Sequence, residues 1–138
     1  MTLIVLALVL APAFRGLWYP APRTVASVVL FAVGAWFGVA GVGALGRNRT
    51  PYPKPLDDSA LVQHGVYAWV RHPLYSSLMF VSVGWALLWA SWAGLVVSGV
   101  LTWLLCAKAR REERWLRERY PAYRDYAQRV KRFVPGLW

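Results

Sequence analysis

The chain has 138 residues, of which 58% are hydrophobic and 15% aromatic, and its formal net charge is +10. This apolar fraction exceeds the roughly 45–50% that is typical of soluble domains, and the length allows one domain. The single cysteine, Cys106, excludes a disulfide or a cysteine-based metal framework within the chain. Two histidines and scattered carboxylates show no recognisable metal-ligand spacing, so we expect no metal site.

Four apolar segments follow one another along the chain and predict an all-α integral membrane protein with about four transmembrane helices. The first, about 2–17, is short for a span, which needs about 20 residues. It lacks the positively charged start of a signal peptide, so we interpret it as a retained span. The second, about 24–45, contains Gly34, Gly38 and Gly41, and small residues of this kind favour close helix packing.

The third and fourth segments divide a stretch between Arg71 and Lys108 that contains no Lys, Arg, Asp or Glu. A single helix over this stretch would be about 50 Å long at 1.5 Å per residue, whereas the hydrocarbon core is about 30 Å thick. We therefore predict a hairpin that turns near residues 90–94, with Trp89 and Trp92 as interfacial anchors.

The basic residues are segregated, because fourteen of the sixteen Lys and Arg lie in 47–71 or from Lys108 onward. The positive-inside rule then places this loop and both termini in the cytoplasm. We expect a proline-rich extended loop over 47–58, a helix continuing over 108–120, an interruption at Pro121 and a short helix over 122–131. Basic residues so near a membrane span suit anionic lipid headgroups, and we expect no nucleic-acid partner.

Two strings of polar residues flank the predicted hairpin, RHPLY at 71–75 and the pair Glu112-Glu113. RHPLY suits a helix start at the headgroup level, since Pro73 is favoured in a first turn. The two glutamates suit a solvated, charge-balanced helix face on which Glu113 pairs with Arg117. A hairpin returns both strings to the same side of the membrane, so Glu112 is also expected to approach His72 and Tyr75.

The strings LVQHGVYAWVRHPLY at 61–75, EERWL at 112–116 and YRDYAQRVKRFVP at 123–135 together resemble the isoprenylcysteine carboxyl methyltransferases and, more distantly, the phospholipid N-methyltransferases. The resemblance covers roughly 51–135. It implies an integral membrane enzyme that uses S-adenosylmethionine without a Rossmann domain. Residues 1–50 would then hold N-terminal transmembrane helices, and 51–138 the cofactor-binding loop, the hairpin and the C-terminal helices, in one domain overall.

The same resemblance implies which residues form the site. Glu112 would meet the charged methionine end of the cofactor, and the family's substrate-contacting arginine falls at Lys108, with Arg110 and Arg111 close by. Lys keeps the charge but lacks the planar fork that suits a carboxylate. The residues implied in cofactor binding are Leu61, Val62, Tyr67, His72, Pro73, Leu74, Tyr75 and Glu112.

The resulting expectation is a membrane methyltransferase that acts on a lipophilic or lipid-linked acceptor, either a carboxylate or an amine. Two alternatives stay open at this point. One is an NADPH-dependent membrane reductase of the sterol-reductase type, and the other is a non-catalytic lipid-binding membrane protein. No catalytic residue is assigned.

Overall fold

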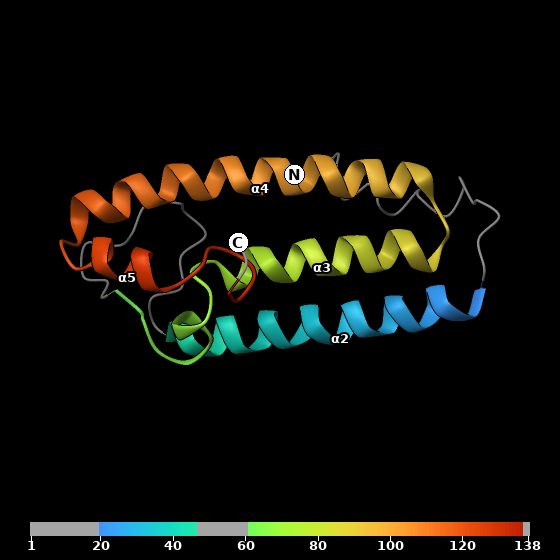
Figure 1. The fold of residues 1–138 in the computed structure, drawn as a ribbon, viewed down its shortest axis with the longest axis horizontal. Helices are drawn as coiled ribbons and strands as arrows, with labels where there is room; N and C mark the ends of the chain where they lie inside the picture. The colour runs from blue at the N-terminus through green and yellow to red at the C-terminus, as the bar shows by residue number, and fades with distance from the viewer. Residues whose placement is uncertain (1–19, 47–60, 137–138) are drawn as a thin grey trace. The chain divides into compact units, whose positions relative to one another are not determined.

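The computed structural model describes residues 20–46 and 61–136. These residues form α2 (Pro20–Leu45), the short 3-10 helix η3 (Gly65–Ala68), α3 (Pro73–Leu88), α4 (Trp92–Arg119) and α5 (Tyr123–Arg129) (Figure 1). Within these two ranges the only β-type pairing is an isolated bridge between Val70 and Lys131, so the all-α prediction is confirmed there. The predicted first span and the 47–58 loop lie outside the described residues.

Two of the described helices, α2 and α4, are long and apolar enough to cross a membrane. Helix α3 is apolar but has 16 residues, about 24 Å at 1.5 Å per residue, which is shorter than a hydrocarbon core of about 30 Å. The count of four spans therefore stays a prediction. Large apolar side chains are exposed along the outer faces of α2 and α4, as lipid contact requires: Val25, Val29, Trp36, Val39, Val96, Val100 and Trp103.

The predicted hairpin between α3 and α4 is confirmed, and its turn is built by local backbone chemistry. Ala90 adopts a left-handed conformation with φ 49°, its N–H donates to the Leu87 carbonyl, and the N–H of Ser91 donates to the Ala86 carbonyl. These bonds form a Schellman motif, which usually has glycine at the left-handed position. The Ser91 hydroxyl then accepts the Gly94 N–H at 3.0 Å and caps the start of α4.

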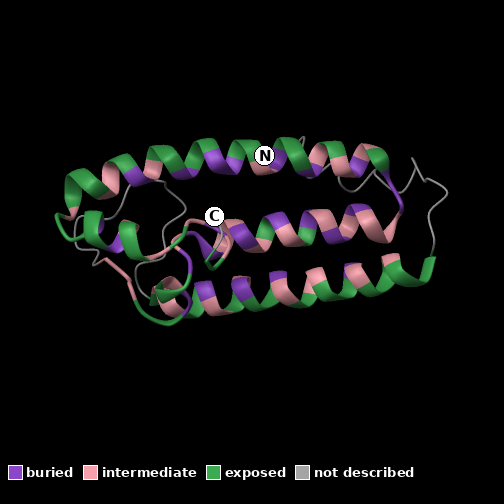
Figure 2. Ribbon diagram, in the orientation of Figure 1, coloured by how far each residue is buried: buried purple, intermediate pink, exposed green. Residues whose placement is uncertain are grey.

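The chain divides into two compact units. In the first, which includes residues 20–36 and 77–105, the buried residues are mostly small or polar, with Met79, Leu101 and Leu105 as larger ones. Figure 2 shows buried positions recurring along each helix. A Cβ atom added at Gly34 would lie 2.7 Å from a methyl group of Val81 and 3.1 Å from the Ser77 carbonyl oxygen. The close packing predicted from the α2 glycines is therefore present at Gly34.

The second unit includes residues 37–46, 61–76 and 106–136. Here Gly41 of α2 packs against the side chains of Pro73 and Leu74 at the start of α3. As predicted, α4 ends before Pro121 and a short helix follows. Helix α5 ends at Arg129, two residues before the predicted limit, because the chain becomes extended there and pairs with the segment before α3.

Candidate functional site

The start of α3 is held by residues from the C-terminal end of the described chain. The backbone N–H groups of Arg71 and His72 donate to the carbonyls of Lys131 and Arg132 at 2.8 and 3.0 Å. The Ser76 hydroxyl donates to the Phe133 carbonyl at 2.7 Å. Residues 131–133, which we call the C-terminal strap, thus satisfy donors that a helix start would otherwise leave unpaired.

His72, Tyr75 and Glu112 form one cluster, as the hairpin predicted. The Tyr75 hydroxyl donates to Glu112 Oε1 at 2.5 Å, and Nδ1 of His72 lies 3.8 Å from Glu112 Oε2. The rings of His72 and Tyr75 stack with centroids 5.2 Å apart and 3° between their planes. Lys108 Nζ lies 5.3 Å from the centroid of the Tyr75 ring, within cation–π range.

Tyr67 belongs to the same neighbourhood. Burial and the nearby charge of Glu112 raise the pKa of Tyr67 to about 12, so its phenol stays protonated at neutral pH. Its backbone is held from α5, because the Tyr126 hydroxyl donates to the Tyr67 carbonyl at 2.5 Å. Burial is likewise the main cause that raises the pKa of Tyr126. Both phenols are therefore donors rather than bases.

Glu113 is buried, with 1% of its surface exposed, so its assignment to a solvated helix face was wrong. The predicted pair with Arg117 is present at 3.4 Å, but Arg132 makes two shorter bonds, at 2.9 and 2.8 Å. Arg71 and Nε2 of His72 each approach Glu113 Oε1 to 3.3 Å. A buried carboxylate needs such partners, since an unpaired charge is costly to remove from water.

The electrostatics of Glu113 follow from these contacts. Burial by itself raises the pKa of its carboxyl group, but hydrogen bonds from His72 and Arg132 and the charge of Arg71 outweigh that effect and bring the pKa to about 2. The bond to Glu113 is in turn the main cause that raises the pKa of Arg132. The pair is therefore ionised at neutral pH.

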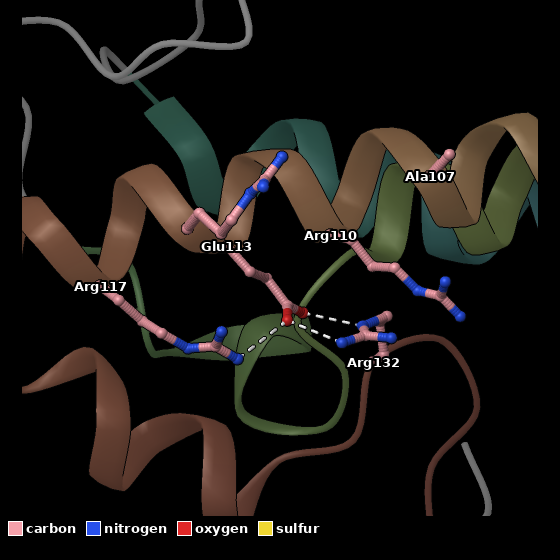
Figure 3. A pocket seen from close by; sticks show the side chains of 6 residues that line it. Ala107, Arg110, Glu113, Arg117 and Arg132 are labelled. Carbon is pink, nitrogen blue, oxygen red and sulfur yellow. Dashed lines mark hydrogen bonds and ion pairs between the residues drawn. The ribbon is translucent and has the colours of Figure 1, made fainter.

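A pocket of about 430 Å³ opens beside Glu113, on a face of α4 other than the one that carries Glu112. Figure 3 shows Arg110 and Arg117 of α4 directed toward the same space as Arg132 of the strap, with the Glu113 carboxylate between Arg117 and Arg132. The pocket is lined by Ala107, Arg110, Glu113, Arg114, Arg117 and Arg132.

The other predicted site residues lie at several places. Leu61 and Val62 are half-buried in the segment before η3, and Arg111 is exposed. Pro73 is buried, and Leu74 packs against Gly41. The structure thus gathers Tyr67, His72, Tyr75, Lys108 and Glu112 and places Arg110 in the basic pocket.

Sequence reasoning missed three contributors to this region: Glu113 as a buried centre, Arg132 as its main partner and Phe133 beside His72. The His72 and Phe133 rings lie 5.8 Å apart between centroids. The string 123–135 carried a signal, since an arginine and an aromatic residue follow its predicted helix. The pattern could not identify their partners, which lie 19 and more residues away.

Comparisons with known proteins define the class. The structure is similar to that of the eukaryotic intramembrane Ras methyltransferase ICMT (isoprenylcysteine carboxyl methyltransferase), with a TM-score of 0.77 and 22% sequence identity. The match covers 99% of this chain and 52% of that one, so the chain spans about half the length of this solved relative. At this identity the match shows a shared fold, and α2 and α4 are long and apolar enough to cross a membrane.

The family model for phospholipid methyltransferases matches residues 22–123, and the chain belongs to this family. No curated protein matches the sequence significantly. The resemblance drawn from the sequence motifs is therefore confirmed, both for the family and for the fold of its structural relative.

Proposed function

We propose that the protein transfers a methyl group from S-adenosylmethionine to a lipophilic acceptor at the cytoplasmic face of a membrane. The observation that carries the proposal is the cluster at Glu112. In a chain of the phospholipid methyltransferase family, a largely buried carboxylate is bonded to Tyr75 and lies beside His72.

The chemistry of this cluster suits the cofactor, which carries a sulfonium and an ammonium group. Glu112 supplies a negative charge that would attract the cationic groups of the cofactor, and its carboxylate is oriented by the bond from the Tyr75 hydroxyl. When bound, S-adenosylmethionine would supply an electrophilic methyl group. The residues proposed to hold it are Leu61, Val62, Tyr67, His72, Pro73, Leu74, Tyr75 and Glu112.

The residues of the chain would act mainly by positioning and by excluding water. Holding donor and acceptor in line supplies much of the rate enhancement for a displacement of this kind. A carboxylate acceptor is ionised at neutral pH and needs no base. An amine acceptor must first lose a proton, for which His72 or a glutamate is the candidate base. Lys108, Arg110 and Arg111 are the proposed contacts of an anionic acceptor.

The deciding experiment measures transfer of a labelled methyl group from S-adenosylmethionine into membrane extracts by the purified full chain. We expect transfer by the wild type and a loss of at least about tenfold in Glu112→Gln, because a charge-assisted contact is worth about 1.5–3 kcal/mol. Arg124→Gln, an exposed change on α5, is the matched control and should transfer normally.

The products and cofactors separate the acceptor classes and the alternatives. Label released by mild base would identify a methyl ester, whereas stable label would identify an N-methyl product. Binding of NADPH instead of S-adenosylmethionine would replace the proposal with a reductase. A folded protein that binds neither cofactor and transfers nothing would support a lipid-binding protein without turnover.

A further inference from the structure

His72 lies between two carboxylates that approach its two ring nitrogens unequally. Its Nε2 lies 3.3 Å from Glu113 Oε1, whereas its Nδ1 lies 3.8 Å from Glu112 Oε2. The first distance is at the long end of the hydrogen-bond range, and the second is beyond it. The two nitrogens therefore have different environments, and the partner of one nitrogen determines which of them carries the proton.

The charge of Glu113 determines what Nε2 must be. Arg132 donates to both oxygens of this carboxylate, at 2.9 and 2.8 Å. Burial raises the pKa of Glu113, but the bonds from His72 and Arg132 and the charge of Arg71 bring it to about 2, so the group is ionised at neutral pH. An ionised carboxylate has only acceptors. Its contact with His72 is therefore a hydrogen bond only when Nε2 carries a hydrogen.

Glu112 makes no matching demand on Nδ1. Its Oε1 accepts the Tyr75 hydroxyl at 2.5 Å, and its Oε2 is too far from Nδ1 for a hydrogen bond. In the neutral form of His72 with its hydrogen on Nε2, the lone pair of Nδ1 thus faces Glu112. The residues proposed to hold the cofactor include both Tyr75 and Glu112, so this lone pair belongs to the same site.

The strap holds this arrangement in two ways. The carbonyl of Arg132 accepts the backbone N–H of His72 at 3.0 Å, while its guanidinium group holds Glu113. The His72 ring also stacks on Tyr75 with 3° between the planes, and the Phe133 ring lies 5.8 Å away between centroids. Backbone, carboxylate and ring contacts together keep Nε2 toward Glu113 and Nδ1 toward Glu112.

We propose that Glu113, held by Arg132, is a positioning residue that places the proton of neutral His72 on Nε2 and leaves Nδ1 as the proton acceptor of the site. With an amine acceptor, an N–H bond of its protonated form would break and the proton would pass to Nδ1. The freed lone pair would then form the bond to the methyl group, and the electron pair of the broken bond to sulfur would stay on the sulfur. This use of Nδ1 rests on the proposed methyl transfer, whereas the tautomer does not.

The test is a side-chain nitrogen-15 NMR titration of the histidine-labelled full chain in an uncharged detergent, without S-adenosylmethionine. The chain has two histidines, and the exposed His64 is the internal reference. Between pH 5 and pH 9 we expect Nδ1 of His72 to lose its proton while Nε2 keeps its own. The ratio of the Nε2–H to the Nδ1–H tautomer should exceed that of His64 at least about tenfold, as expected for a hydrogen bond to a charged group.

Glu113→Gln tests the cause of this preference. An amide can present either a donor or an acceptor to Nε2, so the tautomer ratio of His72 should fall to within about threefold of that of His64. Arg132→Lys keeps the positive charge but loses the planar fork, and its ratio should lie between those of the wild type and Glu113→Gln. Glu118→Gln, an exposed change on the same helix, is the matched control and should keep the wild-type ratio.

Equal tautomer ratios for His72 and His64 in the wild type would overturn the proposal, and this comparison holds even where Glu113→Gln does not fold. An unchanged ratio in folded Glu113→Gln would also overturn it. A His72 that keeps both protons up to pH 9 would do the same, because Nδ1 would then have no lone pair to offer.

The titration uses no cofactor and no turnover, so its result is separate from the proposed activity. A protein with the expected tautomer but no methyl transfer would keep the positioning role and lose the proposed function. Where the labelled product is N-methylated, Glu113→Gln should lower kcat at least about tenfold and leave KM for S-adenosylmethionine within about twofold. An unchanged kcat, or a methyl ester as the product, would remove Nδ1 as the base.

Discussion

At the scale of single residues, two adjacent glutamates have different environments. Glu112 faces Tyr75 and His72, whereas Glu113 is enclosed by arginines. Neighbouring positions of an α-helix point about 100° apart, so one dipeptide contributes to two separate sites. His72 connects them, because Nδ1 faces Glu112 and Nε2 faces Glu113.

The buried charge of Glu113 should appear in the pH dependence of stability. Its pKa is about 2 in the folded protein against an ordinary 4.5, so the unfolded chain takes up the proton first. The stabilisation is complete above about pH 4.5 and is lost as pH falls toward about 2, by at most about 1.4 kcal/mol per pH unit. Denaturant unfolding in micelles at pH 7, 5 and 3 measures this loss.

The matched variants are Glu113→Gln and Glu118→Gln, the second at an exposed position. We expect Glu113→Gln to lower the free energy of unfolding at pH 7 by about 3 kcal/mol, because it leaves buried arginine charge unpaired. The free energy of unfolding of Glu113→Gln should fall less steeply between pH 5 and pH 3 than that of the wild type, whereas Glu118→Gln should behave like the wild type. Identical acid slopes in the wild type and Glu113→Gln would rule out this assignment.

Tyr75→Phe tests the hydrogen bond that orients Glu112. This prediction assumes that S-adenosylmethionine is the cofactor. Loss of the donor frees the carboxylate, so the affinity for S-adenosylmethionine should fall about fivefold, as expected for a hydrogen bond worth about 1 kcal/mol. Isothermal titration calorimetry in detergent measures the affinity for S-adenosylmethionine. Thr102→Val removes a bond of 2.9 Å to the Ser98 carbonyl within α4 and should leave the affinity unchanged. Unchanged affinity in Tyr75→Phe would remove Tyr75 from the site.

At the scale of elements, hydrogen bonds hold the C-terminal strap against the start of α3. Three hydrogen bonds connect 71–76 to 131–133, and Arg132 adds its bonds to Glu113. Phe133 is buried with 1% of its surface exposed. A segment near the end of the chain is therefore needed to hold His72 in place.

Helix α2 provides a matched pair of glycines for testing helix packing. Gly34→Ala brings a Cβ atom to 3.1 Å from the Ser77 carbonyl, a backbone atom that cannot rotate away, and to 2.7 Å from Val81. We expect a loss of about 1–3 kcal/mol from overpacking. Gly43→Ala meets no atom within 4 Å and should be neutral or stabilise by up to about 1 kcal/mol. Unfolding in mixed micelles compares the two, and equal effects would contradict close packing at Gly34.

At the scale of the whole molecule, the distribution of charge predicts topology. Ten of the sixteen basic residues follow residue 107, while the turn between α3 and α4 has none. The positive-inside rule places the C-terminus in the cytoplasm and this turn on the opposite side. Alkaline phosphatase fused after residue 138 should be inactive, and the same enzyme fused after Ala90 should be active. The opposite pattern would invert the predicted orientation.

The sequence by itself determined the all-α class, the hairpin, the break at Pro121 and the family. These features depend on the length of apolar segments, the segregation of charge and the order of motifs, all of which follow from the order of residues alone. It also predicted that Glu112 meets His72 and Tyr75, since a hairpin returns its two ends to one side.

Only the tertiary structure decided the role of Glu113 and of the C-terminal strap. A glutamate among arginines has the same local pattern whether it is solvated or buried. The difference depends on Arg132 and Arg71, which are distant in sequence and become neighbours of Glu113 only when the strap pairs with the start of α3. Arg132 also lines the basic pocket, together with Arg110, Arg114 and Arg117 of α4.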